Sequence, residues 1–176
     1  MWASQVHAGH AARGRKRRGA RLGILSQIAG GPALPGGNRM LRAGTKPDDF
    51  HQRQEGTLPG RYGLRVTAIT EGRLDAEVDI EPWMWAPNGY LHAASVILLA
   101  DTAAGYATVA HLPEGAKGFT TIELKSNFLG TAKEGTMRTE CTAEHLGRTT
   151  QVWSSVVLGP TGKRMALFRC TQLVLW

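Results

Sequence analysis

The chain has 176 residues, which is enough for one domain with a tail, and a hydrophobic fraction of 42%, which is enough for a core. Its formal net charge of +7 belongs to one end, because residues 1–46 hold nine of the 21 lysines and arginines and none of the 14 acidic residues. The other 12 basic residues leave residues 47–176 with a net charge of −2, so a nucleic-acid-binding role would rest on the tail alone.

Residues 1–46 are predicted to be a disordered basic extension. They combine Gly, Pro and Ala with a basic cluster at residues 13–18, and such a segment cannot bury enough apolar surface to become ordered. Three roles are open: a targeting peptide, an arm for nucleic acid or anionic membrane, and a dispensable extension upstream of a start at Met40. The apolar run after Arg21 is too short for a secretory signal, and no stacking aromatics accompany the basic cluster, which favours the dispensable extension.

The first part of the predicted domain, residues 47–176, is expected to contain a short helix and two strands. Lys46-Pro-Asp-Asp can open a helix, and residues 61–69 are expected to form the first strand. In residues 73–80, apolar side chains on one face alternate with charged side chains on the other, as in a half-buried antiparallel strand. Prolines within residues 81–89 predict a loop.

From Ala93 onward the sequence predicts one helix of about 19 residues, roughly 28 Å long. It is apolar around most of its circumference, so it is expected to be buried. Asp101 interrupts the apolar run, which is then too short for a membrane span. Asp101 is also the only charged residue between His92 and His111, and a buried carboxylate is costly without a partner, so it is a candidate functional group. The alternative is that it points to solvent or caps a neighbouring loop.

Four further strands are expected after the helix, over residues 119–129, 136–146, 149–158 and 164–175. In the first of these, alternation places Ile122, Leu124 and Phe128 on one face and Thr121 on the other. The order of elements predicts an α+β fold with one antiparallel β-sheet wrapped around a long central helix.

The residues around the start of the long helix resemble those of a known family. Asn88-Gly-Tyr-Leu-His-Ala-Ala opens the helix, and Ala100-Asp-Thr-Ala lies inside it. This layout resembles the hotdog-fold acyl-CoA thioesterases, most closely the PaaI-like branch of phenylacetic acid degradation. The resemblance covers roughly residues 58–175 and implies a hotdog fold.

The resemblance also implies four catalytic residues. In the family a backbone N–H at the helix N-terminus polarises the thioester carbonyl, aided by the helix dipole, and Ala94 matches that position. A mid-helix carboxylate, usually from the facing subunit, acts as base or nucleophile, and Asp101 matches it. Thr121 matches a hydroxyl that orients the water or the carboxylate. Asn88 can substitute for a loop asparagine that the family often has at the position of Ala86.

Four residues are expected to bind the substrate: His92, Ala93, Arg148 and Tyr90. His92 is expected to bond the loop backbone just before the helix, and Ala93 adds a backbone N–H at the helix start. Arg148 can hold a coenzyme A phosphate, because a guanidinium suits phosphate geometry, or it is a solvated turn residue. Tyr90, together with Trp83 and Trp85, can line an acyl pocket or form an interface.

The sequence departs from the family where Ala93-Ala94 replaces Gly-Gly. Alanine keeps its N–H, but its Cβ can crowd a substrate that must approach the backbone closely. The expected reaction is hydrolysis of a small aryl- or medium-chain acyl-CoA to the free acid and CoA. The alternative is a non-catalytic hotdog protein that binds acyl-CoA or only assembles, and the two alanines favour it.

The remaining expectations concern cofactors, assembly and location. No cofactor or metal is expected. Cys141 and Cys170 form no C-x-x-C pair, so both are predicted to be reduced and buried in a cytoplasmic chain. A homodimer, paired further into a homotetramer, is expected because hotdog domains pair edge to edge. Nucleic acid and membrane are not expected as partners.

Overall fold

The computed structural model describes residues 40–176, and the disorder predicted for residues 1–39 lies outside this range. The helices of the described chain are α1 (Pro47–Arg53), α2 (Leu58–Tyr62) and α3 (Ala93–Ala110), with a 3₁₀ turn, η1, over Pro82–Met84. The strands are β1 (Arg65–Thr70), β2 (Arg73–Asp79), β3 (Gly118–Phe128), β4 (Thr136–Leu146), β5 (Thr150–Leu158) and β6 (Arg164–Leu175).

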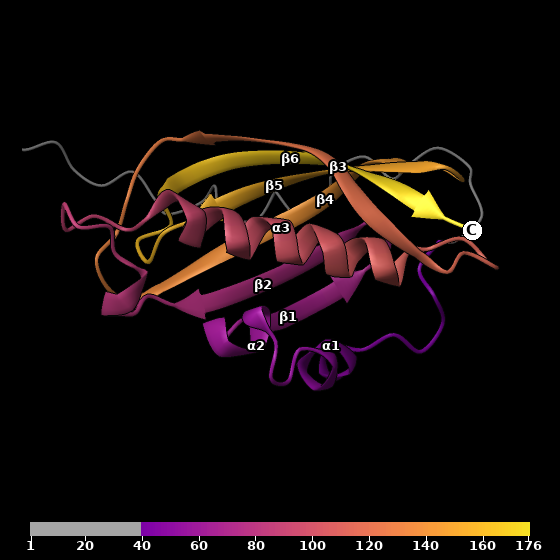
Figure 1. Ribbon diagram of the computed structural model, residues 1–176, viewed down its shortest axis with the longest axis horizontal. Helices are drawn as coiled ribbons and strands as arrows, with labels where there is room; N and C mark the ends of the chain where they lie inside the picture. The colour runs from indigo at the N-terminus through magenta and orange to yellow at the C-terminus, as the bar shows by residue number, and fades with distance from the viewer. Residues whose placement is uncertain (1–39) are drawn as a thin grey trace, which may run out of the picture. The chain divides into compact units, whose positions relative to one another are not determined.

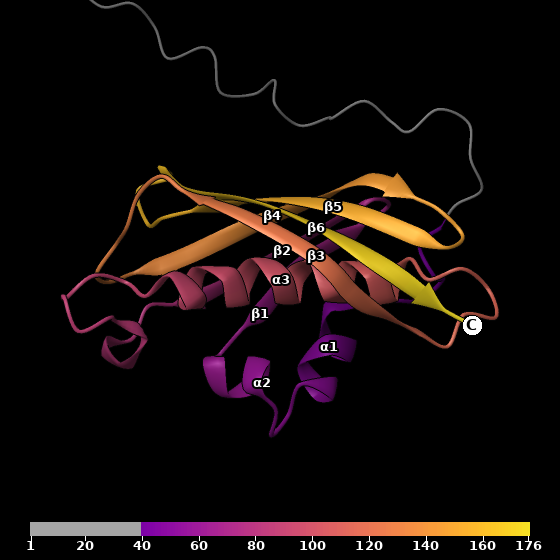
Figure 2. The same ribbon diagram turned by 45° about the horizontal axis from the view of Figure 1, so that its top comes forward.

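These strands form one antiparallel sheet in the order β1-β2-β4-β5-β6-β3, so β1 and β3 lie at its edges. The long helix α3 lies along one face of the sheet, and the sheet curves over it (Figures 1 and 2). The short helices α1 and α2 lie on the other side of α3 (Figure 2). The predicted architecture, an antiparallel sheet wrapped around one long helix, is confirmed.

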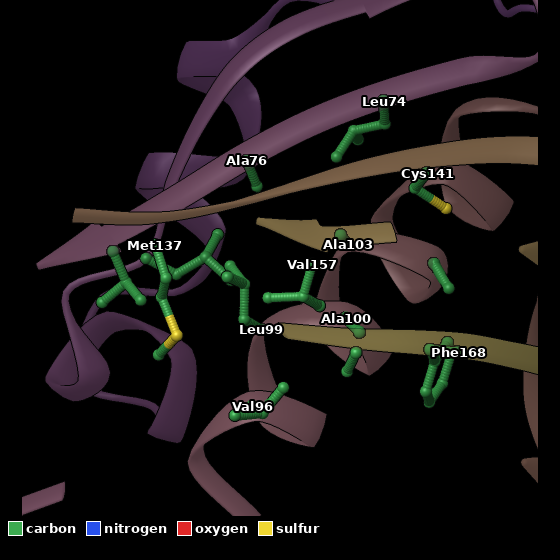
Figure 3. Packing of buried hydrophobic residues seen from close by; sticks show 14 of the residues in the cluster. Leu74, Ala76, Val96, Leu99, Ala100, Ala103, Met137, Cys141, Val157 and Phe168 are labelled. Atoms are coloured by element: carbon green, nitrogen blue, oxygen red, sulfur yellow. The ribbon is translucent and has the colours of Figure 1, made fainter. Parts of the chain in front are cut away.

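Small side chains make the contact between α3 and the sheet. Ala100, Ala103 and Ala107 are almost fully buried, so the helix backbone packs closely on the strands. Figure 3 shows residues of α3 facing side chains of the sheet, among them Leu99, Ala100, Ala103, Ala76, Met137 and Val157. By length and composition α3 is long and apolar enough to cross a membrane, so the prediction that Asp101 leaves it too short for a span is wrong. Half of its residues are nevertheless buried inside the fold, which confirms the predicted buried helix.

The first strand begins later than predicted. We expected it to start at Arg61, but residues 58–62 form α2, and β1 starts at Arg65. Pro59 is tolerated in the first turn of a helix, and Gly63, with φ of 76°, ends α2 in a left-handed conformation. The hydroxyl of Tyr62 donates to the carbonyl of Ser95, which ties α2 to α3. The other five predicted strands match β2 to β6 to within one residue at each end.

The prediction that Thr121 lies on the opposite face of β3 from Leu124 and Phe128 is wrong, because a β-bulge interrupts the alternation. Thr121 pairs with Gln172 and Glu123 with Thr171, so Ile122 is the extra, unpaired residue. After the bulge, Leu124 pairs with the buried Cys170. Thr121 and Leu124 therefore both lie on the face of the sheet that α3 covers.

Residues 40–46, which the sequence analysis placed in the disordered extension, bind to the domain. The backbone N–H groups of Met40 and Leu41 donate to the Glu71 carboxylate over 2.8 and 3.1 Å. The N–H of Arg42 donates to the carbonyl of Ala110, and its guanidinium donates to the carbonyls of Leu112 and Pro113. These bonds satisfy carbonyls at the end of α3, so the described domain starts before residue 47.

Candidate active site

Asp101 lies in the middle of α3 and is half-buried. Its Oδ1 atom is buried and has no hydrogen-bond partner within residues 40–176. Burial raises the pKa of its carboxyl above the ordinary value. A half-buried, unpaired carboxylate is more basic than one in water, which suits it to take a proton from a reacting group.

Neighbouring contacts show which way Asp101 faces. Gly105, one helical turn later, faces β3, because a Cβ added to it would lie 3.1 Å from Cζ of Phe119. Residues four apart lie on the same face of a helix, so Asp101 also faces β3. The pKa of the Cys170 thiol on β6 is raised to about 12, first by burial and then by the charge of Asp101. The carboxylate therefore lies over the β3–β6 side of the sheet.

Thr121 lies on that same side. It follows Phe119 by two residues in the regular part of β3, so both side chains point toward α3. Its hydroxyl donates to Oε1 of Gln172 over 2.8 Å. The structure thus brings two of the four predicted catalytic residues, Asp101 and Thr121, to one side of the sheet.

The start of α3 holds the other predicted groups. The Ala94 N–H, which we assigned to the thioester oxygen, donates to Nδ1 of His92 over 3.0 Å, so His92 caps the helix. Ala93 is an exposed residue, and its N–H has no acceptor within residues 40–176. Asn88 lies in the preceding loop, where its Oδ1 accepts the N–H of Tyr90 over 3.1 Å. The free donor at this helix start is therefore Ala93.

The helix start and Asp101 are too far apart to act on one carbonyl group within one chain. Asp101 follows Ala94 by seven residues on the same helix, which separates their backbones by about 11 Å. A helix fixes this spacing, so one chain cannot bring the two groups together.

Arg148 lies at the other end of α3. It is in the turn between β4 and β5, where nearby Gln151 donates to the carbonyl of His111 over 2.7 Å. Its guanidinium stacks on the ring of Trp176, 4.7 Å from the ring centre. Within one chain, Arg148 and the start of α3 are therefore not brought together.

Tyr90 lies beside the start of α3 and is 55% exposed. Lys133 Nζ lies 6.0 Å from the centre of its ring. Trp83 and Trp85, in the same loop region, are also exposed. All three exposed rings lie in the segment that leads into α3.

Sequence reasoning missed one buried polar residue of this region, Gln172 on β6. The only signal in the sequence was a polar residue on the inward face of a strand. That pattern is the same for a polar residue that is simply buried in the core, so it did not point to a functional role. Cys141 and Cys170 are free and buried, as predicted. Within residues 40–176, no group of three or more His, Cys, Asp or Glu side chains is arranged to hold a metal ion.

Comparison with known proteins places this geometry in a family. Residues 88–166 match the model of the thioesterase superfamily. The proofreading thioesterase EntH of Klebsiella pneumoniae is 31% identical over 121 residues, which cover 69% of this chain and 88% of the relative. The 1,4-dihydroxy-2-naphthoyl-CoA hydrolase of Listeria monocytogenes is 26% identical over 117 residues, 66% of this chain and 94% of that one. The chain belongs to the thioesterase superfamily.

The fold comparison agrees. A mutant of the Pseudomonas aeruginosa thioesterase PA1618 superposes with a TM-score of 0.73 at 25% identity, covering 77% of this chain and 98% of that one. The predicted hotdog fold and the predicted enzyme class, a thioester hydrolase, are therefore confirmed at the level of the family.

Proposed function

We propose that the protein hydrolyses an acyl-CoA thioester, with Asp101 as base or nucleophile and the start of α3 as donor to the thioester oxygen. One observation carries the proposal: an Asp101 oxygen is buried without a hydrogen-bond partner in the described chain, on the central helix of a thioesterase fold. Coenzyme A as the carrier is supported by the Listeria relative, whose name is that of a CoA thioester hydrolase.

In the proposed reaction Asp101 takes a proton from a water molecule as that water attacks the thioester carbon. Negative charge then develops on the carbonyl oxygen, where the Ala93 N–H and the positive end of the helix dipole stabilise it. The carbon–sulfur bond breaks, and the thiolate of CoA leaves and takes up a proton. As a nucleophile, the same carboxylate would attack the carbon directly, and water would release the acid afterwards.

The 11 Å separation on α3 calls for a second subunit, and the sheet offers a place for it. β3 pairs only with β6 in the described chain, so its outer backbone groups are open. Ile122, Leu124 and Phe128 on this edge strand are 57%, 41% and 46% exposed. A long, apolar edge strand favours pairing with another strand. We expect a homodimer with β3 beside its symmetry mate, in which the two α3 helices run antiparallel and the start of one approaches Asp101 of the other.

The acyl group is expected to be aryl or medium-chain. Tyr90, Trp83 and Trp85 at the helix start, and Leu124 and Phe128 on β3, are exposed apolar groups that a dimer would gather around the site. Arg148 lies at the far end of its own α3, and antiparallel helices would bring it toward the partner's helix start. There its guanidinium can bind a phosphate of CoA.

The test is a panel of short, medium-chain and aryl acyl-CoAs, with free thiol measured as the product. Wild-type protein is expected to hydrolyse at least one of them, and Asp101→Asn to lower kcat by about 10²–10⁴, the range for a positioned acid–base group. Asp79→Asn, at an exposed carboxylate that binds Arg65, is the matched control and should keep wild-type kcat.

Binding of acyl-CoA without thiol release in the wild type would favour the non-catalytic alternative. Full activity in a folded Asp101→Asn variant would remove Asp101 from the mechanism.

A further inference from the structure

Gln172 is a fully buried amide on the inner face of β6, with 0% exposure. Both ends of its side chain are bonded: Oε1 accepts the Thr121 hydroxyl over 2.8 Å, and Nε2 lies 3.3 Å from Sγ of Cys170. Gln172 therefore cannot touch a ligand itself. Thr121, whose side chain is exposed, is its link to the side of the sheet that faces Asp101.

The backbone holds Thr121 in this position. Thr121 is the last regularly paired residue before the bulge at Ile122, and bulges redirect side chains and are frequent beside active sites. Phe119, two residues earlier, lies against Gly105, one turn from Asp101. The strand and the helix thus present Thr121 and Asp101 to the same space.

The direction of the Thr121 hydrogen bond limits what its oxygen can do. A hydroxyl has one proton to donate and two lone pairs that accept. The proton is used on Gln172, which itself is held by Cys170. The Thr121 oxygen therefore presents only acceptor positions to the site. An acceptor can bind a hydrogen of water, but it repels an ionised carboxylate and a developing oxyanion.

We propose that Gln172 is a positioning residue that holds the Thr121 hydroxyl as an acceptor for the attacking water. The inference rests on the proposed function and adds to it. One hydrogen of the water is transferred to Asp101, the other is held by the Thr121 oxygen, and a lone pair of the water oxygen forms the bond to the thioester carbon. The bond to sulfur then breaks, and the CoA thiolate takes the proton from Asp101. The sequence left two roles open for Thr121, orienting the water or orienting the carboxylate. The proposal selects the first, orienting the water.

A double-mutant cycle tests the proposal. Thr121→Val keeps the shape and removes the hydroxyl, whereas Thr121→Ser keeps it. Gln172→Met keeps the volume and removes the acceptor. Thr121→Val and Gln172→Met are each expected to lower kcat by about 10–100-fold with KM within about twofold, as for an interaction that acts in the transition state. Thr121→Ser should stay within about threefold of wild type, because the hydroxyl remains.

The double variant shows whether Gln172 acts by positioning Thr121 or only by stabilising the fold. If Gln172 acts through Thr121, Gln172→Met has no further effect once the hydroxyl is gone, so the double variant equals Thr121→Val. Gln151→Met is the matched control, because Gln151 is equally buried, pairs with Gln172 across β5 and β6, and bonds His111 and Trp153 instead of Thr121. In a double variant, any loss of kcat from Gln151→Met should multiply with the loss from Thr121→Val.

Gln172→Glu serves as a second variant in case Gln172→Met does not fold. Its carboxyl oxygen keeps the acceptor at Thr121, so kcat should remain within about tenfold of wild type and fall to the level of Thr121→Val when the two changes are combined. Losses that multiply in the double variants, or a raised KM with unchanged kcat, would overturn the proposal while leaving the proposed function intact. A wild-type protein that releases no thiol from the panel would overturn both.

Discussion

Asp101 reduces the stability of the fold at neutral pH. Burial raises the pKa of its carboxyl above 3.8, so the folded chain holds this proton more tightly than the unfolded chain does. Stability is then lost as pH rises from the unfolded pKa through the raised folded pKa. The asparagine in Asp101→Asn carries no charge at any pH, so this variant is expected to raise Tm at pH 7.

Thermal melts at several pH values between 4 and 7 check this expectation. The gain from Asp101→Asn should shrink as pH falls toward 4. Asp79→Asn is a control of opposite sign, because the hydrogen bond from Arg65 holds the pKa of Asp79 below its ordinary value. That carboxylate stabilises the fold above its unfolded pKa, so removing it should lower Tm slightly at pH 7. A lower Tm for Asp101→Asn at pH 7 would contradict the argument.

Single residues show how far the sequence could predict this site. Asp101 stood out because a charge in an apolar helix is visible in the sequence. That the Ala94 N–H is bonded while the Ala93 N–H is free was not visible, because it depends on the rotamer that brings His92 Nδ1 to the Ala94 N–H. Gln172 was missed for a similar reason, since its bond to Thr121 joins residues 51 positions apart.

At the scale of elements, His111 fixes the end of α3. It is fully buried, and its Nε2 accepts the N–H of Gly72 over 2.9 Å, so that nitrogen carries no proton. Its Nδ1 therefore donates to the carbonyl of Ala107, 2.8 Å away. One neutral ring thus joins the helix end to the turn between β1 and β2.

This arrangement makes the fold sensitive to acid. Burial lowers the pKa of His111 below 6.5, and the Ala107 carbonyl and Glu71 oppose that shift only in part. As pH falls below 6.5 the unfolded chain takes up a proton that the folded chain refuses, so stability is lost. We expect Tm to fall below pH 6.5, and His111→Gln to weaken that dependence while costing about 1–3 kcal/mol at pH 7.

Urea titrations at pH 5.5 and 7.5 measure the free energy of unfolding, and so both its pH dependence and the cost of His111→Gln. His145→Gln, at an exposed position on β4, is the control and should keep the wild-type pH dependence. An unchanged acid response in His111→Gln would assign the sensitivity to other groups.

Element bounds were easier to predict than faces. Turn residues such as Gly162 mark strand ends in the sequence, and most strand bounds followed from them. The bulge at Ile122 has no such marker, because it depends on pairing with β6, and it moved Thr121 to the other face. The last two residues of α2, residues 61 and 62, were predicted as strand because this helix has only five residues and depends on contacts such as that from Tyr62 to Ser95.

At the scale of the whole molecule, we predict that each active site is built from two subunits, with the helix start of one and Asp101 of the other. Asp101→Asn removes the carboxylate and Ala94→Trp blocks the helix start, so each homodimer is expected to be inactive. In an equal mixture about half of the dimers are hybrids, each with one intact site of two, so about a quarter of wild-type activity should return. Thiol release after subunit exchange measures the recovery.

Two controls accompany the mixing experiment. Light scattering should show a dimer or larger assembly for each variant, and each variant alone should stay inactive after the same treatment. Verified hybrid dimers without activity would discard the shared site. A monodisperse monomer of active wild-type protein would discard the dimer itself.

The rigid spacing between the start of α3 and Asp101 has a mechanical consequence in the proposed dimer. Each helix would supply the donor of one site and the carboxylate of the other. A substrate that draws the helix start toward its carbonyl would also displace the carboxylate that serves the opposite site. The two sites would then be linked through the helices themselves, and occupancy of one would alter the geometry of the other without any flexible loop between them.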